Sequence, residues 1–201
     1  STNVLLIRYM APNLDQTYWE MRYQNKNTPW DMGMASPPLI KYFESQPLSS
    51  KILIPGAGQA WEAKWLYEQG FENISVLDLS ESALALAQEK FDEPHKLNWL
   101  LADFFEHQGQ YDLIMEQTFF CALDPNLRAD YALKMKELLK PGGRLFGLLF
   151  NFPLSDDGPP FGGSLEEYQQ LFEKNFKIVH LEPSYNSIKL GKRDFHRADC
   201  L

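Results

Sequence analysis

Short apolar runs alternate with longer amphipathic stretches along the chain from about residue 51 onward. The runs 52–54 and 145–150 are apolar at consecutive positions, a pattern typical of strands that are buried on both faces. The stretches between the runs carry apolar residues at helical spacing, as at Leu84, Ala87 and Phe91. Because parallel strands need a helical crossover between them, this alternation predicts a doubly wound α/β fold with a mostly parallel, seven-stranded sheet.

Capping and turn residues set the expected boundaries of these elements. Gly70 is suited to the left-handed position after a helix, and Ser80 to the position that caps a helix N-terminus. Asp124-Pro125 starts a helix in the same way, and a capping box begins at Ser164. We expect strands at 51–55, 74–78, 97–102, 111–115, 144–150, 176–181 and 194–201. We expect helices at 60–69, 82–91, 125–139 and 164–174, and a turn at 141–143.

The first fifty residues do not follow the alternation of strands and helices. They are rich in aromatic residues and are interpreted as an arm of one or two helices that lies on the α/β body. The length of 201 residues fits one domain, at about 100–200 residues per domain. We therefore expect residues 1–50 to form an arm or lid and residues 51–201 to form the main domain. The aromatic residues of the arm are Tyr9, Tyr18, Trp19, Tyr23, Trp30, Tyr42 and Phe43.

The chain is acidic, with 27 Asp and Glu against 19 Lys and Arg and a net charge of −8. Affinity for nucleic acids rests mostly on Lys and Arg that neutralise phosphates, so this balance argues against a nucleic-acid partner. A local basic cluster near the C-terminus is interpreted as an ordinary solvated turn and strand edge. The cluster consists of Lys189, Lys192, Arg193 and Arg197.

Neither a membrane span nor a disulfide framework is apparent. No stretch approaches the roughly 18 unbroken apolar residues of a membrane helix, and the apolar segment 4–7 is too short for a signal-peptide core. Cys121 and Cys200 are too few for a disulfide scaffold, and Cys121 is interpreted as an inert buried thiol. With so few cysteines, we expect a cytoplasmic location. We also expect a monomer. No metal is expected, because the histidines lack the spacing of paired ligands. The histidines are His95, His107, His180 and His196.

Three features follow predicted strands, at the edge where open α/β sheets bind ligands. A glycine-rich turn, 55–60, follows the first strand and lets a ligand approach the backbone closely. Asp78 ends the second strand, 22 residues after Gly56, where a carboxylate can accept hydrogen bonds from ribose hydroxyls. Asp103 follows the third strand and can meet an adenine amine while Phe104 packs on the ring. Each feature also has a plainer interpretation, as a tight turn, a helix cap or a loop acid.

These features fit both a dinucleotide and an adenosyl ligand. A dinucleotide fingerprint requires a third glycine at position 61, where this chain has Trp61. An indole there would block close packing of helix and strand and would crowd a pyrophosphate. The turn therefore favours a ligand without a diphosphate, which points to S-adenosylmethionine. An NAD(P)-dependent oxidoreductase and a catalytically silent adenosyl-binding protein remain alternatives.

The order of the glycine turn, Asp78, Asp103, 111–115 and 137–143 resembles a class I S-adenosylmethionine-dependent methyltransferase, with its Rossmann-like fold. Three further stretches resemble the thiopurine S-methyltransferase family, and within it the thiol and halide methyltransferases. The resemblance implies methyl transfer to a small soft nucleophile: a thiol, a thiopurine-like thiol, hydrosulfide or a halide. S-adenosylhomocysteine would be the product. The stretches are Trp19-Glu20 with Tyr23 and 28–31, 119–125 with Arg128, and 158–161.

The resemblance implies a role for residues at each strand end and in the arm. Trp19, Tyr23 and Trp30 would form an aromatic wall over the cofactor. Glu116 and Gln117 would lie near the sulfonium and the acceptor. The implied cofactor-binding residues are Trp19, Tyr23, Trp30, Gly56, Gly58, Asp78, Leu79, Asp103, Phe104, Glu116 and Gln117. The implied acceptor pocket contains Trp19, Trp30, Gln117, Phe119 and Tyr185.

The chain departs from the family pattern at several positions. Ile54 replaces a common acid and Ala60 a common glycine, at positions where the family varies. Gln117 and Tyr23 replace a tyrosine and a tryptophan of the halide branch, which weakens the case for a halide acceptor. No general base is expected, because the sequence shows no Ser/His/Asp or Cys/His constellation and a thiolate or halide is already anionic.

Two further stretches have open interpretations. Arg128 can bind an anionic acceptor, but we expect a solvated position on the helix that follows Pro125. The segment 158–163 is rich in glycine and proline, and it is either a rim loop over the acceptor or a plain connector. We favour the rim loop.

Overall fold

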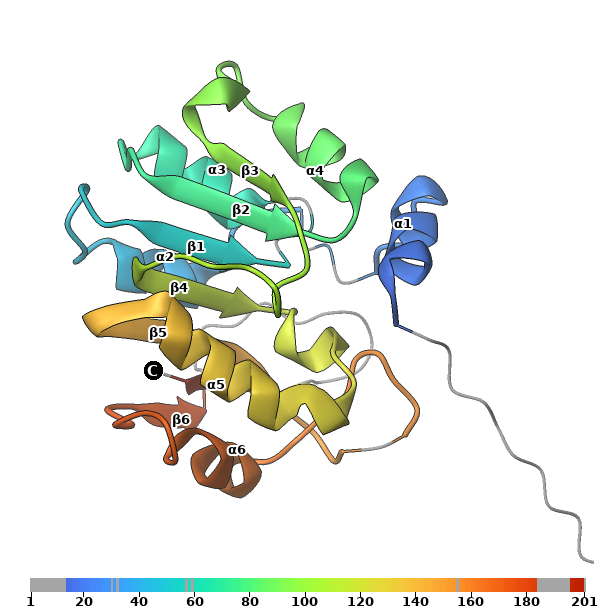
Figure 1. Ribbon diagram of the computed structural model, residues 1–201, viewed down its shortest axis with the longest axis vertical. Helices are drawn as coiled ribbons and strands as arrows, with labels where there is room; N and C mark the ends of the chain where they lie inside the picture. Colours follow the sequence, from blue (N-terminus) through green and yellow to red (C-terminus); the bar gives the residue numbers. More distant parts are fainter. Residues whose placement is uncertain are drawn as a thin grey trace, which may run out of the picture.

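The computed structural model describes residues 14–183 except 30, 32, 57, 59 and 155, and the backbone of 196–200. Five strands, β3, β2, β1, β4 and β5, form a parallel sheet in that order (Figure 1). Strand β7 pairs with β5 in the antiparallel direction, and β6 pairs antiparallel with β7 at the end of the sheet. The predicted α/β fold with a mostly parallel sheet is therefore confirmed. The strands are β1 Ile52–Pro55, β2 Ile74–Asp78, β3 Asn98–Leu101, β4 Tyr111–Gln117, β5 Leu139–Asn151, β6 Leu181–Pro183 and β7 His196–Cys200.

The strand order reverses beside β1. The chain moves outward from β1 to β2 and β3, and then returns to place β4 on the other side of β1. A crevice forms at the carboxyl ends of the strands where the order reverses in this way, and ligands of open α/β sheets bind there. The topology therefore directs attention to the residues that follow β1, β2 and β4.

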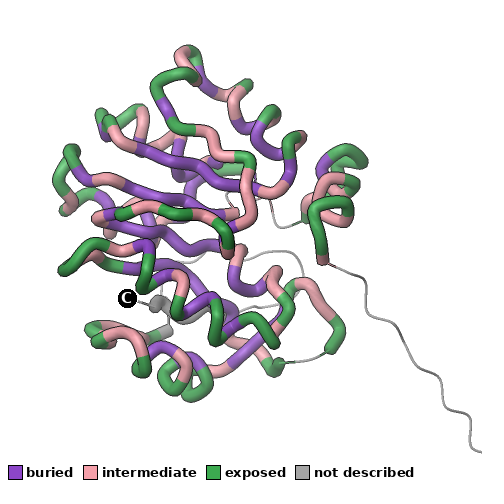
Figure 2. Tube along the Cα trace, viewed as in Figure 1, coloured by how far each residue is buried: buried purple, intermediate pink, exposed green. Residues whose placement is uncertain are grey.

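Helices cover both faces of the sheet, which explains why the strand cores are apolar without alternation (Figure 2). Ile52 and Ile54 of β1 face one apolar cluster, together with α2, α3 and α4. Leu53 faces a second cluster on the other side, together with α5 and α6. These helices are α2 Pro37–Phe43, α3 Trp61–Glu68, α4 Glu81–Gln88, α5 Arg128–Leu138 and α6 Leu165–Phe172.

The capping residues act as the sequence predicts. The Ser80 hydroxyl accepts the Ala83 N–H at 3.0 Å at the start of α4, and the Ser164 hydroxyl accepts the Glu167 N–H at 3.2 Å at the start of α6. Gly70 follows α3 with φ +95°. The helix predicted from 125 instead begins with a short 3₁₀ turn, Pro125–Leu127, before α5.

Two predicted segments differ in the structure. The turn at 141–143 lies inside β5, because Tyr111 pairs with Leu139 whereas Leu113 pairs with Arg144. The extra residues of β5 form an irregularity within the strand rather than a break before it. The strand predicted over 176–181 is wrong in position, because the strand forms at β6, Leu181–Pro183, where these residues pair with β7, and it shares only Leu181 with the prediction.

Helix α1, Gln16–Gln24, belongs to the segment predicted as an arm, and it lies beside the carboxyl ends of the strands, outside the two helical layers (Figure 1). Asp31 and Ser36 contact α3, because the Trp61 indole N–H donates to Asp31 at 2.7 Å and the Ser36 N–H donates to Glu62 at 3.0 Å. No helix in the described part of the chain is long and apolar enough to cross a membrane. Segment 4–7, Tyr9 and the basic residues 189–193 lie outside the described residues.

Candidate active site

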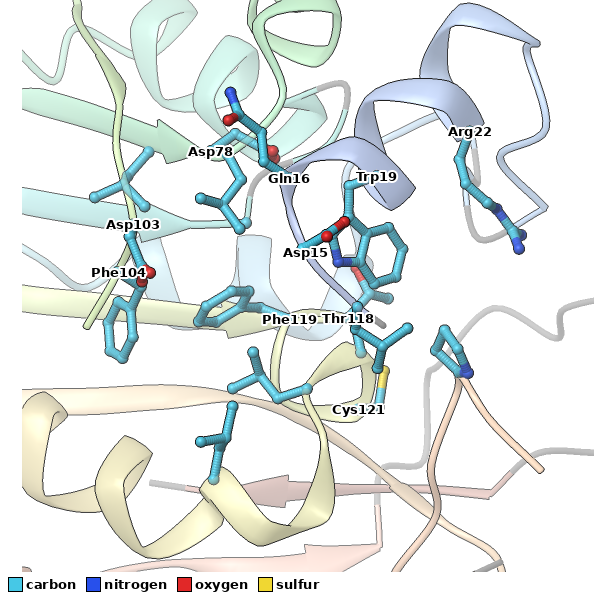
Figure 3. A pocket seen from close by; sticks show the side chains of 18 of the residues that line it. Asp15, Gln16, Trp19, Arg22, Asp78, Asp103, Phe104, Thr118, Phe119 and Cys121 are labelled. Atoms are coloured by element: carbon cyan, nitrogen blue, oxygen red, sulfur yellow. The ribbon is translucent and has the colours of Figure 1, made fainter. Parts of the chain in front are cut away.

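A cavity of about 990 Å³ lies at the carboxyl ends of the strands, and α1 forms one wall of it (Figure 3). Residues that follow β1, β2, β3 and β4 form the opposite walls. The cavity therefore occupies the crevice that the strand order predicts. Trp19, Tyr23, Gly56, Asp78, Leu79, Asp103, Phe104 and Phe119 line it, among the residues that the sequence singles out. Trp30 and Tyr185 lie outside the described residues.

Helix α1 presents one face to the cavity. Besides Trp19 and Tyr23, this face carries three residues that the sequence analysis did not assign, Asp15, Gln16 and Arg22. Asp15 also caps the helix, because its carboxylate accepts the Tyr18 N–H at 3.0 Å. Asp15, Gln16 and Arg22 lie four, three and three residues from Trp19, a spacing that places them on one helix face. This helical spacing is the feature of the sequence that could have identified them as cavity residues.

The bend after β1 depends on Gly56. This residue has φ +59°, and its N–H donates to the Leu77 carbonyl at 2.7 Å. A Cβ at this position would collide with the ring of Phe119, which follows β4. Gly58 does not line the cavity, but its N–H lies 3.4 Å from the Asp78 carboxylate. The glycine turn therefore allows Phe119 and the end of β2 to come close to the same backbone.

Asp78 is a buried carboxylate at the end of β2. One oxygen accepts the Ser80 N–H at 2.9 Å, and the other accepts the Gly58 N–H at 3.4 Å. Burial raises the pKa of Asp78 to about 6, because desolvation outweighs these hydrogen bonds. The side chain lines the cavity, so its oxygens can accept further hydrogen bonds from a ligand.

Asp103 and Phe104 follow β3 on the next wall. The Asp103 carboxylate lines the cavity and accepts the Phe105 N–H at 2.8 Å. The Phe104 ring is buried and packs edge-to-face on Phe119, with ring centroids 5.1 Å apart. Leu79, directly after β2, also lines the cavity. The wall thus combines an apolar aromatic surface with a hydrogen-bond acceptor beside it, the Asp103 carboxylate.

Glu116 and Gln117 do not line the cavity. The Glu116 carboxylate is buried beneath it and accepts the N–H groups of Phe119 at 3.1 Å and Phe120 at 2.9 Å and the Tyr131 hydroxyl at 2.6 Å. Burial raises the pKa of Glu116 to about 7. Strand β4 extends two residues beyond the predicted end at 115, so the chain first reaches the cavity at Thr118 and Phe119.

The wall formed by the turn after β4 and by the 158–163 segment is apolar. Pro159 and Pro160 line the cavity, and the Phe161 N–H donates to the Cys121 carbonyl at 2.7 Å. The segment is therefore a rim loop rather than a plain connector. Cys121 is buried, as predicted, and it also lines the cavity. This wall also contains Phe119, Ala122, Leu123, Leu127 and Phe150.

Arg128 is buried rather than solvated, which corrects the expectation from the sequence. Its guanidinium lies over the Phe120 ring at 4.4 Å and donates to the Gly162 carbonyl at 2.6 Å. The cause is helical spacing, because Arg128 shares one face of α5 with the buried residues Tyr131 and Met135. Arg128 does not line the cavity, and it instead holds the rim loop against α5.

The charges around the cavity are mostly negative. Among the described residues that line it, Asp15, Asp78 and Asp103 are acidic and Arg22 is basic. Carboxylates in a partly desolvated cavity attract a cation and repel an anion. The cavity therefore suits a ligand with positive charge better than one with a diphosphate.

Residues 14–194 match the family model described as thiopurine S-methyltransferase. The chain is 32% identical over 200 residues to a probable thiol methyltransferase 2 of Arabidopsis thaliana, covering 96% of this chain and 87% of that protein. It is 32% identical over 193 residues to a thiocyanate methyltransferase 1 of Brassica oleracea, covering 92% of this chain and 84% of that protein. The fold resembles that of 1,6-didemethyltoxoflavin-N1-methyltransferase of Burkholderia thailandensis, solved with S-adenosylhomocysteine. That match has a TM-score of 0.72 and 17% identity, over 98% of this chain and 91% of the other.

Proposed function

The chain belongs to the thiopurine S-methyltransferase family, and we propose that it transfers a methyl group from S-adenosylmethionine to a small soft nucleophile. The acceptor classes are a thiol, a thiopurine-like thiol, hydrosulfide and a halide. The observation that carries this proposal is that one cavity combines an acidic part around Asp78 and Asp103 with an apolar part around Phe119 and the rim loop. The first part suits a cationic adenosyl compound and the second suits a soft acceptor.

The residues around the strand ends fit the cofactor part by part. Gly56 lines the cavity, and its lack of a side chain would let the methionine portion lie against the backbone. Asp78 can accept both ribose hydroxyls, and Asp103 with Phe104 can flank the adenine. Trp19 and Tyr23 of α1 would cover the bound molecule on the side opposite the sheet.

The apolar part of the cavity favours an acceptor with an apolar body. When bound, S-adenosylmethionine supplies a methyl group that its sulfonium already activates for in-line displacement. A thiolate needs no proton removed, and none of the described residues of the apolar wall is a histidine or a carboxylate. This wall would exclude water and hold the acceptor near the reacting carbon, which is where positioning contributes most.

A screen of methyl acceptors tests the proposed function. We expect the largest kcat/KM for thiols with an apolar or aromatic body, lower values for hydrosulfide and thiocyanate, and the lowest for iodide. Volatile products would be measured in the headspace and other products by chromatography of radiolabelled methyl. A protein that binds S-adenosylhomocysteine but methylates no member of the panel would be a silent adenosyl-binding protein, contrary to the proposal.

Binding of a dinucleotide is disfavoured at the N-terminus of α3. A pyrophosphate in a dinucleotide site lies on that helix end, where the backbone N–H groups point toward the anion. Here Asp31 binds the Trp61 side chain and Glu62 is buried in the first turn. Two carboxylates in this position would repel a diphosphate.

Titration calorimetry compares the two cofactor classes directly. We expect S-adenosylhomocysteine to bind with a micromolar or lower dissociation constant and NAD to give no measurable heat. The reverse order would contradict the assignment of the cavity, because it would require a diphosphate beside Asp31 and Glu62.

A further inference from the structure

Helix α1 covers the cavity but buries little of its own surface. Tyr23 is its one buried residue, and most of its other side chains are half-buried or exposed. By contrast, α2 of the same arm places Leu39 and Phe43 in the main apolar cluster. Because apolar burial stabilises the docking of most helices, α1 depends to an unusual extent on polar contacts.

Glu20 supplies these contacts at the N-terminus of α4. Its carboxylate accepts the Ser80 hydroxyl at 2.7 Å, the Ser82 N–H at 3.2 Å and the Ser82 hydroxyl. The Ser82 N–H is one of the first N–H groups of α4, which have no partner within the helix. A carboxylate at this end is also favoured by the helix dipole. Hydrogen bonds from Ser82 and Ser80 hold the pKa of Glu20 below its usual range, so the group is charged at neutral pH.

Ser80 links these contacts to the floor of the cavity. Its side chain is fully buried, and its hydroxyl donates to Glu20 while its N–H donates to Asp78 at 2.9 Å. The same hydroxyl accepts the Ala83 N–H, so its position is set by α4. Ser80 therefore links the Asp78 carboxylate, which we propose binds the ribose, to the Glu20 carboxylate of α1.

We propose that Glu20 is a positioning residue that fastens α1 to the N-terminus of α4, so that Trp19 and Tyr23 are held over the cofactor at Asp78. This inference rests on the proposed function. Glu20 does not line the cavity itself and acts through the helix that carries Trp19 and Tyr23. Loss of its contacts would let α1 move away from the sheet and would open the cavity to water.

Substitution of Glu20 tests this role through cofactor affinity. We expect Glu20→Ala to weaken S-adenosylhomocysteine binding by about 10-fold to 100-fold in calorimetry, because several hydrogen bonds to a charged group are lost. Glu20→Gln keeps one acceptor oxygen and should give an intermediate loss. Glu81→Gln is the matched control, because it removes a charge from the same helix end at a residue in the first turn of α4. It should bind like the wild type.

Hydrogen exchange of residues 16–24 provides a readout that does not need the cofactor. In the ligand-free protein, Glu20→Ala should exchange these amides at least about tenfold faster than the wild type and Glu81→Gln, with β1 and β2 unchanged. Ser82→Ala should add little to Glu20→Ala in the double variant, because both remove the same contact.

The outcomes separate the positioning role from the proposed function. Equal affinity and equal α1 exchange in Glu20→Ala and the wild type would overturn the positioning role. If the wild type failed to bind S-adenosylhomocysteine, the proposed function would be wrong, and the exchange of α1 would still decide whether Glu20 fastens the helix. A uniform rise in exchange over the sheet would indicate global destabilisation and would also count against the inference.

Discussion

Gly56→Ala is expected to reduce kcat/KM for S-adenosylmethionine, measured at saturating acceptor, by at least about 100-fold while leaving the protein folded. The backbone at Gly56 has φ +59°, a conformation that costs an L-residue roughly 1–2 kcal/mol. The added Cβ would also collide with the Phe119 ring, which packs against Phe104 and Tyr131 and lines the cavity, so the cavity offers the free space into which the ring would move. The displaced ring would then occupy space that we assign to the cofactor and the acceptor. Steady-state kinetics together with calorimetry of S-adenosylhomocysteine would measure the effect.

Gly142→Ala separates the collision from the backbone strain. Gly142 has φ +79°, but nothing lies within 4 Å of a Cβ at that position. This variant should lose a similar amount of stability, roughly 1–2 kcal/mol, and keep the activity of the wild type. If the two variants lost activity equally, the cavity beside Gly56 would not be the site of the reaction.

Asp78→Ala is expected to weaken S-adenosylhomocysteine binding by roughly 1–3 kcal/mol, or about 5-fold to 150-fold. The substitution would leave the ribose hydroxyls without an acceptor. It would also leave the N–H groups of Ser80 and Gly58 without their present partner. Asp112→Ala is a suitable control, because Asp112 also accepts a backbone N–H, from Lys51, but at the start of β4 on the opposite edge of the sheet. Unchanged affinity in Asp78→Ala would contradict the ribose assignment.

The pH dependence of binding gives a second view of Asp78. Its pKa is about 6 in the ligand-free protein, and hydrogen bonds from a ribose would favour the charged form in the complex. Binding would therefore release a proton at low pH, and affinity should fall by up to about tenfold per pH unit below pH 6. Asp78→Asn should remove this dependence. A slope that persists in Asp78→Asn would point to another group, such as Glu116, whose pKa is about 7.

The strand and helix pattern could be predicted because it depends on local chemistry and on burial that repeats along the chain. Apolar runs and capping residues such as Ser80 and Ser164 indicate elements whose ends lie within about three residues of those in the structure, except that β5 and β6 each begin five residues from the predicted start. Asp78, Asp103 and the glycine turn could be predicted as neighbours because parallel strands end at the same edge. The structure places all three at one cavity.

Other site features could not be predicted because they depend on contacts between distant segments. The family resemblance places Glu116 near the cofactor, but only the fold shows that its carboxylate accepts hydrogen bonds from the Phe119 and Phe120 N–H groups and the Tyr131 hydroxyl instead. The burial of Arg128 likewise depends on the rim loop that brings the Gly162 carbonyl to its guanidinium.

The sequence by itself determined the α/β class, the family and the edge of the sheet that carries the cavity, because these follow from short-range patterns and strand ends. The tertiary structure alone decided which side chains face the cavity and which support it from beneath. It also decided how α1 reaches α4 through Glu20, a contact between residues about sixty positions apart. Such contacts depend on where packing places each surface in space, and no local periodicity encodes that placement.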